Sequence, residues 1–145
     1  MVRHMKQLLT ILCLLILSSY SHSEGISPDQ LVKKDGIYYE VNSNTPFTGS
    51  VMEYYENGQL KIRENFKDGK EEGLSEYFHE NGELEFRGNV KEGKEDGLWE
   101  SYHENGQLES RGNLKEGESD GLWEYFDEDG NLTNTEEYKD GELID

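Results

Sequence analysis

Residues 96–117 read DGLWESYHENGQLESRGNLKEG, and their pattern of glycines and large apolar side chains recurs every 24 residues along the chain. Glycine forms three columns at this interval, which are Gly49, Gly73, Gly97 and Gly121; Gly58, Gly82, Gly106 and Gly130; and Gly69, Gly93, Gly117 and Gly141. Apolar side chains form further columns, which are Tyr54, Phe78, Tyr102 and Phe126; Leu60, Leu84, Leu108 and Leu132; and Phe66, Val90, Leu114 and Tyr138. Such self-similarity at a fixed period is typical of a repeat protein, in which each unit packs on its neighbours.

Each unit has the pattern of a β-hairpin, with a strand, a tight turn, a second strand and a looser turn. Glu56-Asn57-Gly58 and its three counterparts form the tight turns, because glycine readily adopts the positive φ that a short hairpin requires. A three-residue loop with Gly58 in the αL bulge position sets Tyr54 opposite Leu60, which matches the two apolar columns. The sequence therefore predicts an all-β fold, an extended and twisted antiparallel sheet of consecutive hairpins.

The two faces of this sheet differ in composition. Because 24 is even and side chains alternate along a strand, each column stays on one face. The even-numbered face is predicted to carry the core, which comprises Tyr54, Leu60, Ile62, Phe66, Leu74, Phe78, Leu84, Phe86, Val90, Leu98, Tyr102, Leu108, Leu114, Leu122, Phe126, Leu132 and Tyr138.

The odd-numbered face combines aromatic residues with an arginine column. We interpret it as the candidate partner-binding face, which comprises Tyr77, Trp99, Trp123, Tyr125, Arg63, Arg87 and Arg111. The alternative interpretation is a solvated face that is held together by cross-strand pairs of Arg, Glu and aromatic side chains.

The first 23 residues have the composition of an export signal. Arg3, His4 and Lys6 form a basic start, residues 8–17 are apolar apart from Thr10, and residues 18–23 form a small polar stretch. The apolar run is far shorter than the ~20 residues that cross a bilayer, so a retained membrane anchor is the less favoured alternative. The sequence predicts a chain that is exported to the periplasm or secreted.

The charge of the chain limits its partners. Fourteen Lys and Arg stand against 32 Asp and Glu, giving a formal net charge of -18, so nucleic acid and anionic membrane surfaces are repelled at long range. A protein is the predicted partner. The strand edge near Asp145 is a second predicted contact, for self-association with another copy, unless local charges protect it.

No group of residues in the sequence has the arrangement of a catalytic site or a metal site. His79 and His103 occupy equivalent positions, two strand spacings of about 4.8 Å apart, which is too far to share a zinc ion. The glutamate column of Glu76, Glu100 and Glu124 has a spacing of about 10 Å, at or beyond the upper limit for carboxylates that share a substrate. We therefore predict no enzyme activity, no catalytic residue, no cofactor and no metal.

The stretch quoted above resembles the variant class of MORN repeats (membrane occupation and recognition nexus), and the resemblance runs from about residue 47 to residue 142. Residues 35–39 and 45–49 resemble the lead-in hairpin of bacterial proteins of this kind. The resemblance implies a sheet of successive hairpins that contacts partners through a face or groove. Bacterial proteins of this kind are often grouped as antitoxins of toxin-antitoxin systems, which implies an immunity-like role.

The predicted organisation has three parts, which are an export signal at residues 1–23, a lead-in segment at 24–46 and four repeats at 47–145. The predicted function is that of an exported protein-binding module, either immunity-like against a toxin that acts in the envelope or a scaffold of an envelope assembly. The alternative is carbohydrate or peptidoglycan binding, in which Trp99 and Trp123 stack on sugar rings.

Overall fold

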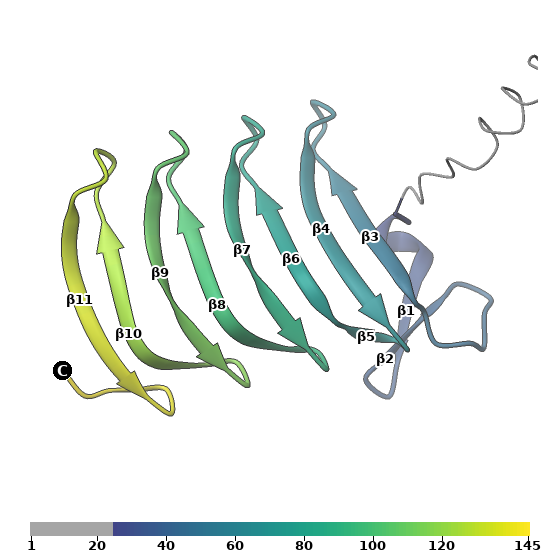
Figure 1. The fold of residues 1–145 in the computed structure, drawn as a ribbon. Coiled ribbons are helices and arrows are strands. Elements are labelled where there is room, and N and C mark those ends of the chain that lie inside the picture. The colour runs from purple at the N-terminus through teal and green to yellow at the C-terminus, as the bar shows by residue number, and fades with distance from the viewer. Residues whose placement is uncertain (1–24) are drawn as a thin grey trace, which may run out of the picture.

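The structure, a computed structural model, describes residues 25–145. The predicted export signal lies outside these residues. The main element is one antiparallel sheet in which consecutive hairpins lie side by side as a single layer (Figure 1). Its strands follow the order β12-β11-β10-β9-β8-β7-β6-β4-β3, and β5 pairs with β4 at one end. The predicted fold class is thereby confirmed.

The sheet strands follow one another along the chain. They are β3 (Gly49–Tyr54), β4 (Leu60–Lys67), β5 (Lys70–Glu71), β6 (Gly73–Phe78), β7 (Leu84–Lys91), β8 (Lys94–Tyr102), β9 (Leu108–Lys115), β10 (Glu118–Phe126), β11 (Leu132–Lys139) and β12 (Glu142–Leu143). The four main hairpins are β3 with β4, β6 with β7, β8 with β9 and β10 with β11.

A lead-in segment packs at one end of the array. It begins with the 3-10 turn η1 (Pro28–Gln30), where Pro28 stands in the first turn, a position that proline favours. The strands β1 (Leu31–Lys34) and β2 (Ile37–Glu40) follow as a separate two-stranded sheet. Tyr38 of β2 joins this sheet to the first repeat, because its N–H donates to the Gly69 carbonyl at 2.8 Å.

The turns at Gly58 and its counterparts are the predicted three-residue loops. The Tyr55 N–H donates to the Gln59 carbonyl at 2.8 Å, the Gly58 N–H donates to the Tyr55 carbonyl at 2.9 Å, and Gly58 has a φ of +86°. Tyr54 pairs with Leu60. The predicted loop length and register are therefore confirmed.

The turns at the opposite end of the hairpins are tighter than predicted. Asp68 and Gly69 both have positive φ, +50° and +79°, and they join the paired residues Lys67 and Lys70. This is a two-residue turn with the twist that suits neighbouring antiparallel strands. The prediction of a looser turn here is wrong, because Asp68-Gly69 and its counterparts Glu92-Gly93, Glu116-Gly117 and Asp140-Gly141 have positive φ at both positions and close a two-residue turn.

A β-bulge next to each three-residue loop changes which residues share a face. Tyr77 pairs with Phe86 and the next residue, Phe78, pairs with Leu84, so Glu85 is an extra residue on β7. The other three hairpins have the same shift. Odd-numbered residues of the first strand therefore share a face with even-numbered residues of the second strand beyond the bulge.

This bulge overturns the predicted division into an even-numbered core and an odd-numbered binding face. We call one observed face the aromatic face, after Tyr77, Phe86, Trp99, Trp123, Tyr125 and Tyr138. We call the other the ion-pair face, after Arg63, Glu76, Arg87, Glu100, Arg111 and Glu124.

Burial is concentrated where the lead-in segment covers the first hairpin. Phe47, Val51 and Phe66 form a buried cluster there, with relative exposures of 6%, 3% and 5%. Many residues of the predicted core are instead exposed, namely Tyr54, Leu74, Phe86, Leu98, Leu122 and Leu132. They are exposed because no second layer covers the sheet at these positions (Figure 1).

Candidate functional site

The tryptophan rings of the aromatic face lie on glycine backbone of the neighbouring strand. A Cβ placed on Gly88 would overlap the ring of Trp99, and one on Gly112 would overlap the ring of Trp123. Both glycines are buried and both tryptophans are partly exposed. One side of each ring is thus covered by the sheet, and glycine is required for this close approach.

The two indole groups differ in their hydrogen bonds. Nε1 of Trp99 donates to the Asn89 carbonyl at 3.2 Å. Nε1 of Trp123 is buried, and among residues 25–145 it has no partner. Equivalent residues in adjacent hairpins therefore have different polar surroundings.

Tyrosines of the aromatic face bind carboxylates. The Tyr77 hydroxyl donates to Glu64 at 2.6 Å, and burial, followed by this hydrogen bond, raises the pKa of Tyr77. The hydroxyls of Tyr125 and Tyr138 both donate to Glu136, at 2.8 and 2.6 Å. These two hydrogen bonds, chiefly that from Tyr138, lower the pKa of Glu136. Aromatic side chains and carboxylates thus alternate on this face.

A shallow apolar groove of about 150 Å³ lies in the aromatic face at the third and fourth hairpins. We call it the notch. Its floor contains Ser101 and Ser110, whose hydroxyl oxygens are 2.7 Å apart in a hydrogen bond. Its apolar lining is made by Phe86, Trp99, Leu114 and Trp123. The notch brings together the two tryptophans of the predicted binding face.

The three arginines of the predicted binding face lie on the opposite side of the sheet from Tyr77, Trp99, Trp123 and Tyr125. Each arginine forms an ion pair with a glutamate of the next hairpin. The pairs are Arg63 with Glu76 at 2.9 Å, Arg87 with Glu100 at 2.6 Å and Arg111 with Glu124 at 2.6 Å. The prediction that all seven residues share a face is wrong, and its cause is the bulge.

The register extends these ion pairs into a row across the sheet. Glu76 is opposite Arg63 on one side and Arg87 on the other, and Glu100 is likewise opposite Arg87 and Arg111. Arg87 also lies over the ring of Tyr102, 5.6 Å from its centre. These arginines and the glutamate column therefore match the alternative interpretation, cross-strand pairs on a solvated face.

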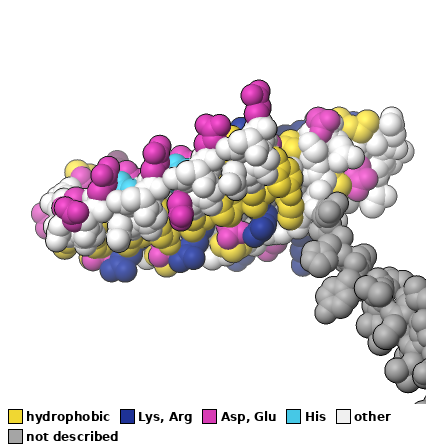
Figure 2. Space-filling model, turned by 90° about the horizontal axis from the view of Figure 1, so that it is seen from above, with side chains coloured by type: hydrophobic (Ala, Val, Ile, Leu, Met, Phe, Trp, Pro, Cys, Tyr) yellow, Lys and Arg dark blue, Asp and Glu magenta, His cyan; other side chains and the backbone are white. Residues whose placement is uncertain are grey.

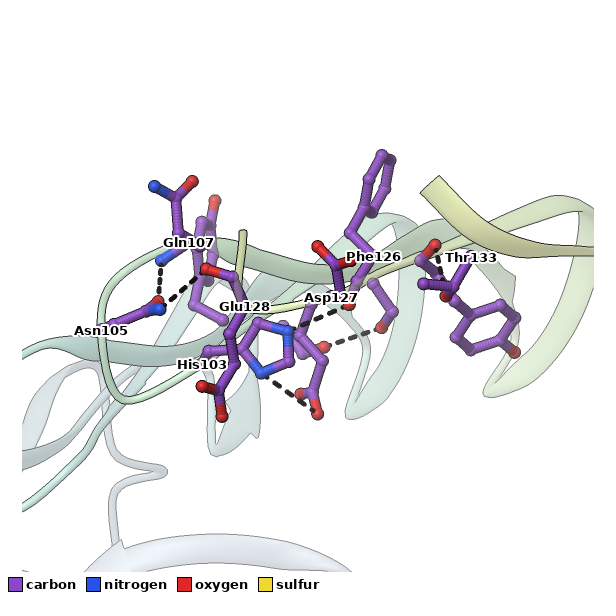
Figure 3. Close-up of polar contacts among 12 residues, drawn as sticks. His103, Asn105, Gln107, Phe126, Asp127, Glu128 and Thr133 are labelled. Atoms are coloured by element: carbon purple, nitrogen blue, oxygen red, sulfur yellow. Dashed lines mark hydrogen bonds and ion pairs between the residues drawn. The ribbon is translucent and has the colours of Figure 1, made fainter. Parts of the chain in front are cut away.

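The histidines connect neighbouring hairpins. Nε2 of His103 donates to the Phe126 carbonyl at 3.0 Å (Figure 3). Nε2 of His79 makes the equivalent bond to the Tyr102 carbonyl at 2.9 Å. The side-chain amide of Asn105 adds a bond to the Glu128 carbonyl at 2.9 Å. These side chains hold the three-residue loops of adjacent repeats together.

Charge is distributed unevenly over the surface. Figure 2, which views the array from the three-residue loops, shows acidic side chains along these loops. Along one long side of the array it shows hydrophobic side chains together with Lys and Arg.

No cluster of three or more His, Cys, Asp or Glu suited to a metal occurs within residues 25–145. In the same range no helix is long and apolar enough to cross a membrane.

Five residues of the notch lie outside the predicted binding face, namely Phe86, Glu100, Ser101, Ser110 and Leu114. Phe86 and Leu114 were assigned to the core because the bulge was not foreseen. Comparison of the repeats could have identified the two serines, because each stands in a column of larger side chains. Ser101 stands where neighbouring repeats have Tyr77 and Tyr125, and Ser110 stands in the column of Ile62 and Phe86.

The geometry defines a class of protein, a single-layered array of β-hairpin repeats with an open aromatic face. The family model of the MORN repeat variant matches at residues 47–68, 71–92, 95–116 and 119–140, and the chain belongs to this family. Repeats of this family are generally modules that bind proteins or membranes. Neither the comparison with curated proteins nor that with solved structures gives a match.

Proposed function

We propose that this chain is an exported protein-binding module that receives its partner on the aromatic face. The observation that carries the proposal is the notch, an apolar groove between Trp99 and Trp123 at a part of the aromatic face that no other element of residues 25–145 covers. Aromatic side chains bordering an apolar groove are typical of the centre of a protein interface. The ion-pair face supports this choice, because its charges already have partners within the sheet.

The net charge of the chain supports a protein as its partner rather than a membrane, which is the other kind of partner that repeats of this family bind. The formal net charge of -18 opposes binding to an anionic membrane surface. The tryptophans support a protein over a sugar, since the sheet covers one side of each ring and the partner must reach into a groove. Within this function, the predicted export signal favours an immunity-like role toward an envelope protein, with an envelope scaffold as the second role.

The test is an affinity capture from an envelope extract with four forms of the chain. Wild type is compared with Trp99→Ala plus Trp123→Ala and with Phe86→Ser, which introduces the residue that the third repeat has in this column. Leu98→Ala plus Leu122→Ala is the matched control, because these exposed leucines are adjacent to the tryptophans and point to the opposite face. Circular dichroism verifies that every variant retains its β-structure.

We expect one discrete protein to bind wild type and the leucine control, and to be lost from the tryptophan variant and weakened by Phe86→Ser. Capture that is lost in the leucine control and kept in the tryptophan variant contradicts the assignment of the face. Retention of glycan alone contradicts the assignment of a protein partner and favours the carbohydrate alternative.

A further inference from the structure

The notch exists because two columns of the repeat lose their large side chains in the same hairpin. Ser101 replaces the tyrosine of the hairpins before and after it, and Ser110 stands in the column of Ile62 and Phe86. Ser101 and Ser110 are direct partners in the sheet register. Both replacements therefore fall at one point of the aromatic face and open a space there.

The size and polarity of this space suit one apolar side chain. An apolar cavity of roughly 150 Å³ accepts a molecule as large as benzene. The two serine hydroxyls bind each other, so one of their two hydroxyl hydrogens is already used within the floor. Glu100 also borders the notch, but its carboxylate is paired with Arg87 on the ion-pair face. The other lining residues are aromatic or aliphatic, which favours the side chain of phenylalanine or leucine over a polar group.

An acidic hollow of about 250 Å³ adjoins the notch, with Trp99 bordering both. Tyr77 and Val90 form its apolar part, and Glu71 and Glu95 contribute carboxylates. Lys94 also lines the hollow, and its ammonium group is paired with Glu116 at 3.3 Å.

The environment of Glu71 is unfavourable for its negative charge. Burial is the main cause that raises the pKa of Glu71, the nearby charges of Glu64 and Glu95 add to it, and the charge of Lys33 partly offsets them. A cation placed in this hollow would relieve that repulsion. Within residues 25–145 no arginine takes this role, because Arg63, Arg87 and Arg111 lie on the ion-pair face.

We propose that the notch and the acidic hollow together bind a protein segment in which an apolar side chain is adjacent to a lysine or arginine. The apolar side chain enters the notch, and the cation lies next to Glu71 and Glu95. This inference rests on the proposed function, since it specifies which partner the aromatic face selects.

Three synthetic peptides test the inference on the full chain, namely Gly-Lys-Phe-Lys-Gly, Gly-Glu-Phe-Glu-Gly and Gly-Lys-Ser-Lys-Gly. Trp99 and Trp123 are the two tryptophans of the chain, so their indole N–H signals in NMR titrations report directly on the notch. We expect the first peptide to bind at least about tenfold more tightly than the other two, because only it offers both groups. Equal affinities for the three, or no change of either indole signal at millimolar peptide, overturn the inference.

Two variants separate the contributions of shape and charge. Ser101→Tyr plus Ser110→Phe fills the notch with the residues that Tyr77 and Phe86 provide in the second repeat, and we expect at least about tenfold weaker binding of the lysine–phenylalanine peptide. Glu71→Gln plus Glu95→Gln is expected to lower the preference for lysine over glutamate peptides at least about threefold. Leu98→Ala is the control on the opposite face. If circular dichroism shows that the double serine variant is unfolded, the single variant Ser110→Phe is used in its place.

Failure of this inference can be distinguished from failure of the proposed function. A partner protein that is captured equally by wild type and by the filled variant, and that is lost in the tryptophan variant, leaves the aromatic face as the binding face. That result overturns the notch as the binding point, as does unchanged peptide affinity in the filled variant.

Discussion

The two faces of this single sheet are built from alternate residues of the same strands and are stabilised in different ways. On the aromatic face, large rings lie on glycine backbone, as Trp99 does on Gly88. On the ion-pair face, opposite charges meet between hairpins, as Arg87 and Glu100 do at 2.6 Å. Ring packing depends on shape and tolerates little added volume, whereas exposed ion pairs contribute little and are screened by salt. The comparison indicates that ring packing on the aromatic face contributes more to the stability of the array than the ion pairs of the other face do.

The largest effect is expected where a side chain is added beneath a ring. Gly112→Val places Cβ and two methyl groups in the space occupied by Trp123, which must move off the sheet. We expect the free energy of unfolding to fall by about 3 kcal/mol, as for severe overpacking of a core. Urea denaturation followed by circular dichroism measures it.

The matched control for this change is the next residue, on the other face. Asn113 is exposed, and Asn113→Tyr, which also adds side-chain volume, is expected to alter the unfolding free energy by less than about 0.5 kcal/mol. Comparable losses in the two variants would show that the faces do not differ in their tolerance of side-chain volume.

The fold is predictable from the sequence because its signals are local and repeated. The 24-residue period predicts the succession of hairpins, because each turn uses residues with a clear backbone preference. The requirement that Tyr54 and Leu60 lie opposite each other on one face predicts the three-residue loop. The bulge has no such signal. Its extra residue, Glu85 in the second repeat, is an ordinary strand residue, and the change of face follows from hydrogen bonds across the sheet.

The candidate site shows the consequence of this missing signal. Trp99 and Trp123 lie together in the notch as the sequence suggests, but Arg87 and Arg111 lie on the reverse side because one residue of register exchanges the faces. The contribution of Ser101 and Ser110 to the notch can be recognised only once the register shows that they lie opposite each other.

A smaller effect is expected within the aromatic face itself. Trp99→Phe and Trp123→Phe remove similar ring area over Gly88 and Gly112, but only Trp99→Phe also removes a hydrogen bond, that to the Asn89 carbonyl. We expect Trp99→Phe to be the more destabilising by about 1 kcal/mol, the usual value of such a bond. Urea denaturation of both variants measures the difference. Equal losses would mean that ring packing alone determines the contribution of each tryptophan.

The smallest effect is expected on the ion-pair face. A double-mutant cycle of Arg87→Gln and Glu100→Gln isolates the energy of their ion pair from the effects of each change alone. The side chain of Arg87 is 46% exposed and that of Glu100 is 16% exposed, so solvent screens the pair. We expect a coupling of about 0.5 kcal/mol at low ionic strength, as for an exposed pair.

Salt then distinguishes the two faces in one experiment. At about 1 M salt the screening length falls to about 3 Å, and the coupling of Arg87 with Glu100 should approach zero. The difference between Trp99→Phe and Trp123→Phe should remain, because it comes from a bond between uncharged groups. A coupling above about 2 kcal/mol that persists in high salt would mean that the ion pair behaves as a buried one. In that case both faces, rather than the aromatic face alone, would determine how the hairpins stack.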